Sequence, residues 1–425
     1  MAVLLFALSF GWSWLFPVAQ VLWWGLLAAT GVDIYRLFAQ TPRFSVRREV
    51  PERISLGDEN TVKLRFEYPG DEPLTLSVID ELPMQFQERK FSFDLTLKPR
   101  QETLATYPLR PVSRGRYGFG KVRAFLRGKW GLAQRRFSFS LEEEVAVYPS
   151  VLQMRKYELI ASSELAQAYG VRKLRRIGHS YEFEQIKNYV QGDDYRSINW
   201  KATSRRNQLM VNQYQDERSQ QIYVILDKSR TMRMPFNGLT LLDYAINAAL
   251  VISNLALKKQ DKAGLLTFSD KLGPRVKATR KKGQIRRILE TLYRQKTDFP
   301  EANYELLYQS IRREVNGRSL LLLFTNFESM SALERVLPLL RRLNKLHLLV
   351  VVIFENTEMQ HFFRSEAESI EDIYTQTIAR KMVSEKRKMA FRMSQYGIQN
   401  ILTTPEDLSM QSVNKYLELK SRGLI

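Results

Sequence analysis

The first 32 residues contain no charged side chain, and their hydrophobic run is interrupted at Gly11 and Pro17. As one helix the run would extend roughly 48 Å, whereas the hydrocarbon core of a bilayer is roughly 30 Å thick. The pattern therefore predicts a transmembrane helical hairpin over residues 1–38, with helices at about 2–16 and 18–35. The alternative is a cleaved signal peptide, but the run lacks a basic start and a small-residue cleavage site.

The next region alternates apolar and polar side chains with period two. Residues 61–68 and 74–79 follow this pattern, and turn-forming Gly, Pro and Asp residues recur at short intervals between such segments. Short strands separated by frequent turns are typical of an antiparallel sandwich of about a hundred residues. We therefore expect an immunoglobulin-like β-sandwich over residues 44–150. It contains no acid–base cluster, which favours a spacer or interaction module.

From residue 221 the pattern changes to strands alternating with helices. Residues 222–226, 320–324 and 348–353 are unbroken apolar runs, as in strands that are covered on both faces. Strands are also expected at 263–268 and 398–402, and helices at 241–257, 285–294, 304–313, 370–395 and 408–420. Alternation of this kind predicts a doubly wound α/β domain with a mostly parallel sheet over residues 221–425.

The composition limits the chemistry. The chain has no cysteine and three separated histidines, which excludes disulfides and thiolate metal sites and disfavours a histidine metal site. Lys and Arg exceed Asp and Glu by 65 to 45, a net charge of +20. The basic clusters at 172–176, 280–282, 341–342 and 386–388 are spread over several elements. This distribution favours solvated faces attracted to an anionic lipid bilayer over nucleic-acid binding.

A first candidate site follows the strand predicted at 222–226. Asp227, Ser229 and Thr231 have a D-x-S-x-T spacing, which brings a carboxylate and two hydroxyls to the carboxyl edge of a parallel sheet. Such oxygens suit a hard cation, for example Mg²⁺. The spacing resembles the metal-ion-dependent adhesion site of von Willebrand factor A domains, and the downstream order of strands and helices agrees with that fold. Alternatively, Asp227 and Ser229 cap the following turn.

The resemblance to the adhesion site is partial. At the position of the family's later aspartate this chain has Asn326, and no residue in 297–305 aligns cleanly with the family's intervening threonine. Losing a carboxylate weakens the attraction for Mg²⁺. The resemblance therefore implies a degenerate site at Asp227, Ser229, Thr231 and Asn326, and it favours a metal-free site over one that holds Mg²⁺.

The segment 151–220 contains the most specific motif. Residues 182–205 read EFEQIKNYVQGDDYRSINWKATSR. This block resembles the signature of the bacterial domain-of-unknown-function-58 family, and the order of hairpin, β-domain, signature and von Willebrand A-like domain extends the resemblance to the whole chain. It implies a bacterial inner-membrane protein that acts with a MoxR-type AAA+ ATPase.

The signature also has a physical interpretation. Asp193 or Asp194 can cap a short helix near residue 195, on which Arg196 and Trp200 are i, i+4 neighbours that allow a cation–π contact. We expect Asp193, Asp194, Arg196 and Arg205 to form ion pairs that dock this segment onto the α/β domain. Recognition of a partner is the alternative.

The sequence thus predicts a non-enzymatic, membrane-anchored adaptor. It has no phosphate-binding P-loop and no G-x-S-x-G nucleophile motif. Residues 36–53 hold five arginines against two glutamates, so we expect the large C-terminal part to face the cytoplasm. The alternative function is a metal-dependent hydrolase that uses Asp227 with Asp193 or Asp194. The oligomeric state stays open, a homo-oligomer included.

Overall fold

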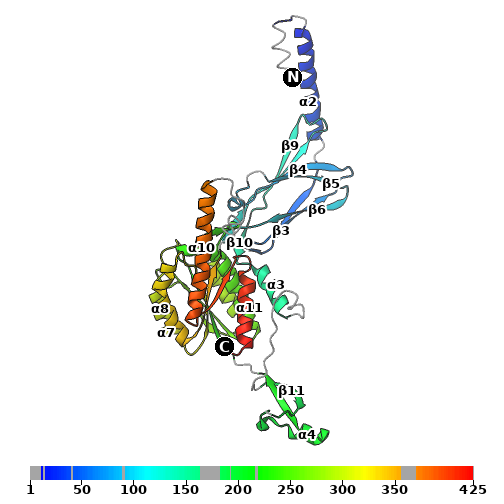
Figure 1. The fold of residues 1–425 in the computed structure, drawn as a ribbon. Helices are drawn as coiled ribbons and strands as arrows, with labels where there is room; N and C mark the ends of the chain where they lie inside the picture. The colour runs from blue at the N-terminus through cyan, green and yellow to red at the C-terminus, as the bar shows by residue number, and fades with distance from the viewer. Residues whose placement is uncertain are drawn as a thin grey trace. The chain divides into compact units, whose positions relative to one another are not determined.

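The computed structural model describes residues 11–12, 15–39, 42–88, 91–162, 182–191, 193–215, 219–355 and 370–424 (Figure 1). The chain divides into two compact units, Met1–Tyr148 and Pro149–Ile425. The first contains an apolar helix and a β-rich body, and the second contains an α/β body. Each unit is described by itself.

The first unit opens with the helix α2 (Leu15–Ala39). Its segment Phe16–Ala39 is long and apolar enough to cross a membrane, and only 11% of that segment is buried. Pro17 lies in its first turn, where the missing N–H has no intrahelical partner to lose. The first helix of the predicted hairpin, at about residues 2–16, falls almost entirely outside the described residues.

The β-rich body consists of three small sheets. The first has the order β1(Ser45–Glu49)-β3(Asn60–Tyr68)-β6(Gln101–Leu109), and the second has the order β5(Ser92–Leu97)-β4(Leu74–Asp80)-β8(Val122–Arg127)-β9(Gln134–Phe139). The third is β2(Arg53–Ser55)-β10(Glu143–Tyr148)-β7(Gly115–Phe119), in which β2 and β10 are parallel. All other pairs here are antiparallel. Val62, Leu64 and Phe66 are buried at alternate positions of β3, which confirms the period-two prediction. A short 3-10 helix, η1, spans Met84–Phe86.

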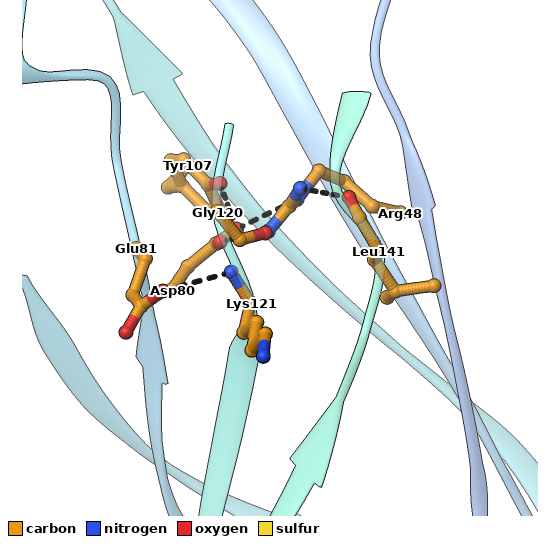
Figure 2. Close-up of polar contacts among 7 residues, drawn as sticks. All are labelled: Arg48, Asp80, Glu81, Tyr107, Gly120, Lys121 and Leu141. Atoms are coloured by element: carbon orange, nitrogen blue, oxygen red, sulfur yellow. Dashed lines mark hydrogen bonds and ion pairs between the residues drawn. The ribbon is translucent and has the colours of Figure 1, made fainter. Parts of the chain in front are cut away.

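A buried ion pair joins the sheets of this body (Figure 2). Arg48 and Asp80 pair through two nitrogens of the guanidinium, with side chains that are 1% and 0% exposed. Arg48 also donates to the backbone oxygens of Leu141 over 2.6 Å and Gly120 over 3.0 Å, and the Tyr107 hydroxyl donates to Asp80. Burial raises the pKa of the Tyr107 hydroxyl, so it stays protonated and keeps donating.

The second unit begins with α3 (Val151–Ser162), which packs on the helix α5 (Leu241–Lys258). Glu158 accepts from Asn254 over 2.9 Å and from Lys258 over 2.8 Å. A small module over residues 182–215 follows. It contains β11(Glu182–Asn188), the 3-10 helix η3(Tyr195–Ser197), α4(Trp200–Arg206) and β12(Met210–Gln215), with β11 and β12 antiparallel.

The body of the second unit is a six-stranded sheet with the order β17-β16-β13-β18-β19-β20. Neighbouring strands are parallel except for the edge strand β17. The strands are β13(Gln221–Asp227), β16(Lys262–Phe268), β17(Val276–Thr279), β18(Leu320–Phe324), β19(Leu348–Phe354) and β20(Gln399–Thr403). The predicted strands therefore form, with boundaries that differ by a residue or two.

Helices cover both faces of this sheet, as the unbroken apolar strands predict (Figure 1). The helices α7(Tyr304–Glu314), α8(Met330–Leu346) and α10(Ile370–Gln395) share one core with Ile225, Leu323 and Val351. The helices α5 and α11(Leu408–Ser421) pack together on the other face, where α6(Gln284–Tyr293) also contacts α5. Helix α5 is long and apolar enough to cross a membrane, but its span is 83% buried, which marks it as a core helix. The 3-10 helix η4(Arg230–Met232) and the short strands β14(Pro235–Phe236) and β15(Leu239–Thr240) link β13 to α5.

Candidate functional site

The candidate site lies at the carboxyl edge of the two central strands. Asp227 is the last residue of β13, and Thr325 and Asn326 directly follow β18. Leu226 pairs with Phe324 in the parallel register, so Asp227 and Thr325 are neighbours across the edge. Side chains at this edge of an open α/β sheet point away from the hydrogen-bonded core, which is why ligands commonly bind there.

Asp227 is fully buried and is held by hydroxyls and one backbone amide. Its Oδ1 accepts from the backbone N–H of Ser229 over 2.8 Å. Its Oδ2 accepts from the Thr325 hydroxyl over 2.7 Å and from the Tyr304 hydroxyl over 3.2 Å. The two hydroxyls are themselves 2.6 Å apart. None of the ion pairs recorded for the described residues includes Asp227.

The pKa of the Asp227 carboxyl is set mainly by its burial. Loss of hydration raises the pKa of the Asp227 carboxyl, and the hydrogen bonds from Thr325 and Ser229 offset part of that rise. The pKa of Tyr304 is raised well above its usual value, by burial first and then by the nearby carboxylate. Its ring is fixed between Phe268 and Phe327, at centroid distances of 5.4 and 6.0 Å. Tyr304 is therefore a positioned donor to Asp227.

The other predicted residues continue this cluster. The hydroxyls of Ser229 and Thr231 are 3.1 Å apart, and the Asn326 amide nitrogen donates weakly to the Thr231 backbone oxygen over 3.4 Å. Hydrogen bonds thus connect Asp227, Ser229, Thr231 and Asn326 in that order. The structure brings together all four residues that the sequence singled out.

The positively charged side chain of Lys386 lies at the outer end of the cluster. Lys386, on α10, donates through Nζ to Asn326 Oδ1 over 2.5 Å and to the Phe327 backbone oxygen over 2.6 Å. Burial lowers the pKa of the Lys386 ammonium to about 8, against an opposing effect of the Glu328 carboxylate. The amide oxygen of Asn326 therefore already binds a positively charged group.

Lys386 and Asn326 also line a cavity of about 170 Å³. Its walls are mostly apolar, with the carboxylates of Glu328 and Glu355 as further polar groups; the apolar lining consists of Met234, Phe236, Leu241, Phe354, Met382, Val383 and Pro405. Glu328 lies 3.5 Å from Arg230, which partly balances its charge. Drug-sized ligands and cofactors generally occupy pockets of about 300–1,000 Å³. This cavity is sized for one side chain.

The described cluster does not fit Mg²⁺. The site has a single carboxylate, and both of its oxygens accept hydrogen bonds. The Asn326 amide oxygen is bound to an ammonium, which would repel a nearby dication. No group of three or more His, Cys, Asp or Glu residues able to hold a metal occurs among the described residues.

Sequence reasoning missed three residues of the site. Thr325 directly precedes Asn326, and parallel register could have placed it beside Asp227. Tyr304 lies within residues 297–305 and reaches Asp227, whereas Thr297 in the same stretch donates to the Lys228 backbone oxygen over 2.8 Å. Lys386 was grouped with a basic cluster, because nothing local distinguishes it from its exposed neighbours Arg387 and Lys388.

The signature residues make their described contacts within their own module. Asp193 pairs with Lys187 over 2.9 Å and accepts from the backbone N–H of Val190, and both hydrogen bonds lower the pKa of the Asp193 carboxyl. Asp194 caps η3 by accepting from the backbone N–H of Arg196 over 3.0 Å. The cap at Asp194 is as predicted. The predicted docking of this segment onto the α/β body stays a prediction.

The cation–π prediction needs revision. Arg196 lies over the ring of Tyr195 at 5.6 Å, because η3 ends at Ser197 and a new helix, capped by Asn199, begins at Trp200. Arg196 and Trp200 are therefore not on one helix. Trp200 is 69% exposed, and Arg205 is exposed in the last turn of α4.

Comparison with solved structures gives weak likenesses. One is the proximal thread matrix protein 1 from the mussel byssus with a zinc-occupied MIDAS motif, at 11% identity over 48% of this chain and 46% of that one, with a TM-score of 0.29. Another is the CARDB domain of the PF1109 protein of Pyrococcus furiosus, at 14% identity over 25% of this chain and 90% of that one, with a TM-score of 0.18. Scores this low establish no common fold.

Comparison of sequences is more specific. The uncharacterized protein YeaD of Bacillus subtilis (strain 168) is 30% identical over 125 residues, which cover 29% of this chain and 30% of that protein. The match therefore spans less than a third of the relative's length. Residues 185–378 of this chain match the model of the family described as Protein of unknown function DUF58; they include most of the signature module and the cluster around Asp227, but not Lys386.

Proposed function

We propose that this protein is a non-enzymatic, membrane-anchored adaptor of the bacterial inner membrane that acts with a MoxR-type AAA+ ATPase. In this proposal α2 is one helix of a membrane hairpin, the β-rich body is an immunoglobulin-like spacer, and both units face the cytoplasm. The α/β body is of the von Willebrand A type, and the protein partner binds at its degenerate adhesion-like site of Asp227, Ser229, Thr231 and Asn326, through the cavity that Asn326 and Lys386 line beside the buried Asp227.

The observation that carries the proposal is the position of Lys386. Its ammonium is tied to the strand edge by Asn326 and Phe327 and also lines the small apolar cavity. An ammonium has three N–H donors, and the described contacts use two of them. A partner that inserts an apolar side chain and places a hydrogen-bond acceptor beside it would match this arrangement.

This arrangement supports binding better than catalysis. A hydrolytic site needs a positioned acid or base with access to substrate. Asp227 is fully buried, and its described partners are Ser229, Thr325 and Tyr304. Asp193 and Asp194 form their described bonds inside the signature module, and no described contact connects them to Asp227. Nothing in the geometry favours the metal-dependent hydrolase.

Site-specific photocrosslinking in the membrane tests the proposal. Met382 lines the cavity and is partly exposed, so a photoreactive residue placed there should crosslink to an AAA+ ATPase of the MoxR type. Tyr374 is exposed on the same helix outside the cavity lining and provides the control position. Crosslinks to the ATPase at 382 that greatly exceed those at 374, and that are lost in Lys386→Met, are the expected result. Absence of ATPase crosslinks at 382, or equal yields at the two positions, would contradict it.

A further inference from the structure

A turn of the β-rich body is bound directly to the helix α2. The side chain of Asp33, near the end of α2, is 1% exposed. It accepts hydrogen bonds from the backbone N–H groups of Trp130, Leu132 and Ala133 over 3.3, 3.1 and 3.1 Å. These three residues belong to the turn between β8 and β9. The carboxyl group of Asp33 thus satisfies three backbone N–H groups of the turn at once, which ties the turn to the helix.

The turn is shaped for this junction. A Cβ atom on Gly128 would lie only 2.2 Å from a carboxylate oxygen of Asp33, so only glycine allows the approach. Gly131 has φ +69°, a left-handed conformation that most residues adopt only at a cost. The sequence Gly-Lys-Trp-Gly at 128–131 thus fits the end of α2 into the turn.

Further contacts fix the direction of the helix. Arg135 on β9 donates to the Leu37 backbone oxygen over 3.2 Å and lies 4.6 Å above the ring of Phe38. Arg36 lies 5.6 Å above the ring of Trp130. Contacts from the helix therefore reach both the turn and the following strand. The β8–β9 hairpin and the end of α2 form one joint.

The tip of this hairpin has an unusual surface. Trp130 and Leu132 are 51% and 43% exposed. Residues 122–139 contain five cationic side chains and no acidic one. Arg123 is paired with Glu81, whereas Arg127, Lys129 and Arg136 are exposed. An exposed tryptophan and leucine among exposed cations match the interface of an anionic bilayer, where aromatic rings lie at the level of the headgroups.

We propose that the β8–β9 tip is a second membrane-binding element, with Trp130 and Leu132 in the headgroup region of an anionic bilayer. The inference rests on the proposed insertion of α2. Because Asp33 ends the uncharged stretch of the chain and is bound to this tip, the tip lies where the helix leaves the hydrocarbon core. The joint then holds the β-rich body against the membrane surface.

The cysteine-free sequence allows a direct test with single-cysteine variants of the full chain. Leu132→Cys keeps the backbone N–H that Asp33 needs, and an environment-sensitive fluorophore on it reports the tip. Met84→Cys, at a position in the same unit that is 92% exposed, is the matched control. Leu22→Cys, within α2, reports insertion of the helix. The protein is reconstituted into phosphatidylcholine vesicles with and without phosphatidylglycerol, and quenching by brominated lipids is measured.

We expect strong quenching at position 22, clear quenching at 132 that increases with phosphatidylglycerol, and little quenching at 84. A label at 132 that stays unquenched while the label at 22 is quenched would overturn this inference and leave the anchor proposal intact. No quenching at 22 would overturn the anchor and this inference together. Quenching at 132 that does not respond to phosphatidylglycerol would overturn the preference for anionic lipid.

Replacement of the three exposed cations separates the electrostatic contribution to membrane binding from the apolar one. The triple variant Arg127→Gln, Lys129→Gln and Arg136→Gln leaves Trp130 and Leu132 in place. At low salt it should remove most of the effect of phosphatidylglycerol on quenching at 132, because each cation near an anionic surface contributes to binding. An unchanged response would contradict the proposed electrostatic role of these residues.

Discussion

Two buried aspartates in this chain have opposite surroundings. Asp80, in the β-rich body, is paired with Arg48 and accepts from Tyr107 (Figure 2). Asp227, at the strand edge of the α/β body, has only hydroxyls and a backbone N–H as described partners. Both carboxylates are buried, but only the first has its charge compensated by a fixed cation.

The difference indicates which group is structural. A guanidinium with four described hydrogen bonds locks Asp80 into one arrangement, and that arrangement joins the four segments that contain Arg48, Asp80, Gly120 and Leu141. Hydroxyls can donate or accept, whereas an ionised carboxylate only accepts, so Asp227 depends on neutral donors and not on a fixed counter-charge. The cation nearest in the hydrogen-bonded cluster, Lys386, is held by the amide of Asn326 instead. A cluster of neutral donors next to the ammonium of Lys386, which itself lines a cavity, suits a binding contact better than a structural ion pair does.

The largest expected effect is at Asp80. Asp80→Asn leaves the guanidinium of Arg48 buried without a counter-charge, and breaking a buried pair from one side costs about 3–5 kcal/mol in the free energy of unfolding. Denaturant unfolding of the full chain in detergent measures this loss. Asp94→Asn, at an exposed position of β5, is the control and should change stability by less than about 0.5 kcal/mol. A loss at Asp80 no larger than at Asp94 would refute the structural role of the pair.

A smaller effect is expected from the titration of Lys386. Burial lowers the pKa of its ammonium to about 8, whereas the unfolded chain keeps the ordinary value of about 10.5. Between these values the unfolded state binds more protons, so stability should rise with pH, by about 3 kcal/mol in total. The groups that line the same cavity as this ammonium include the carboxylates of Glu328 and Glu355. Comparison of wild type with Lys386→Met isolates the contribution, and identical pH dependence in the two proteins would contradict it.

The sequence predicted most of the α/β body and part of the β-rich body. The apolar runs at 320–324 and 348–353 became β18 and β19, because strands covered on both faces need no polar positions. The alternation at 61–68 became β3, because one face of this strand is buried and the other is largely exposed. Local patterns of this kind are set by burial and require no knowledge of distant residues.

The partners of the buried charges could not be predicted in this way. Arg48 and Asp80 are 32 residues apart, Asp227 and Thr325 are 98 apart, and Lys386 is 60 residues from Asn326. In the sequence, Lys386 and its basic neighbours have the pattern of an ordinary solvent-exposed cluster. Such pairings follow from the order of the strands and the packing of the helices. The D-x-S-x-T spacing was informative because it lies within a single turn.

The smallest change in unfolding free energy is expected for a substitution of Asp227. This substitution tests the central claim, which is that the strand-edge site works with the ammonium of Lys386 and without a metal. The unfolding free energies of wild type and Asp227→Asn should be compared with Mg²⁺ and with a chelator. Since the amide can accept from Ser229 and exchange hydrogen bonds with Thr325 and Tyr304, we expect a change below about 1 kcal/mol, with no effect of Mg²⁺ on either protein. Stabilisation of the wild type by Mg²⁺ that disappears in Asp227→Asn would contradict the claim.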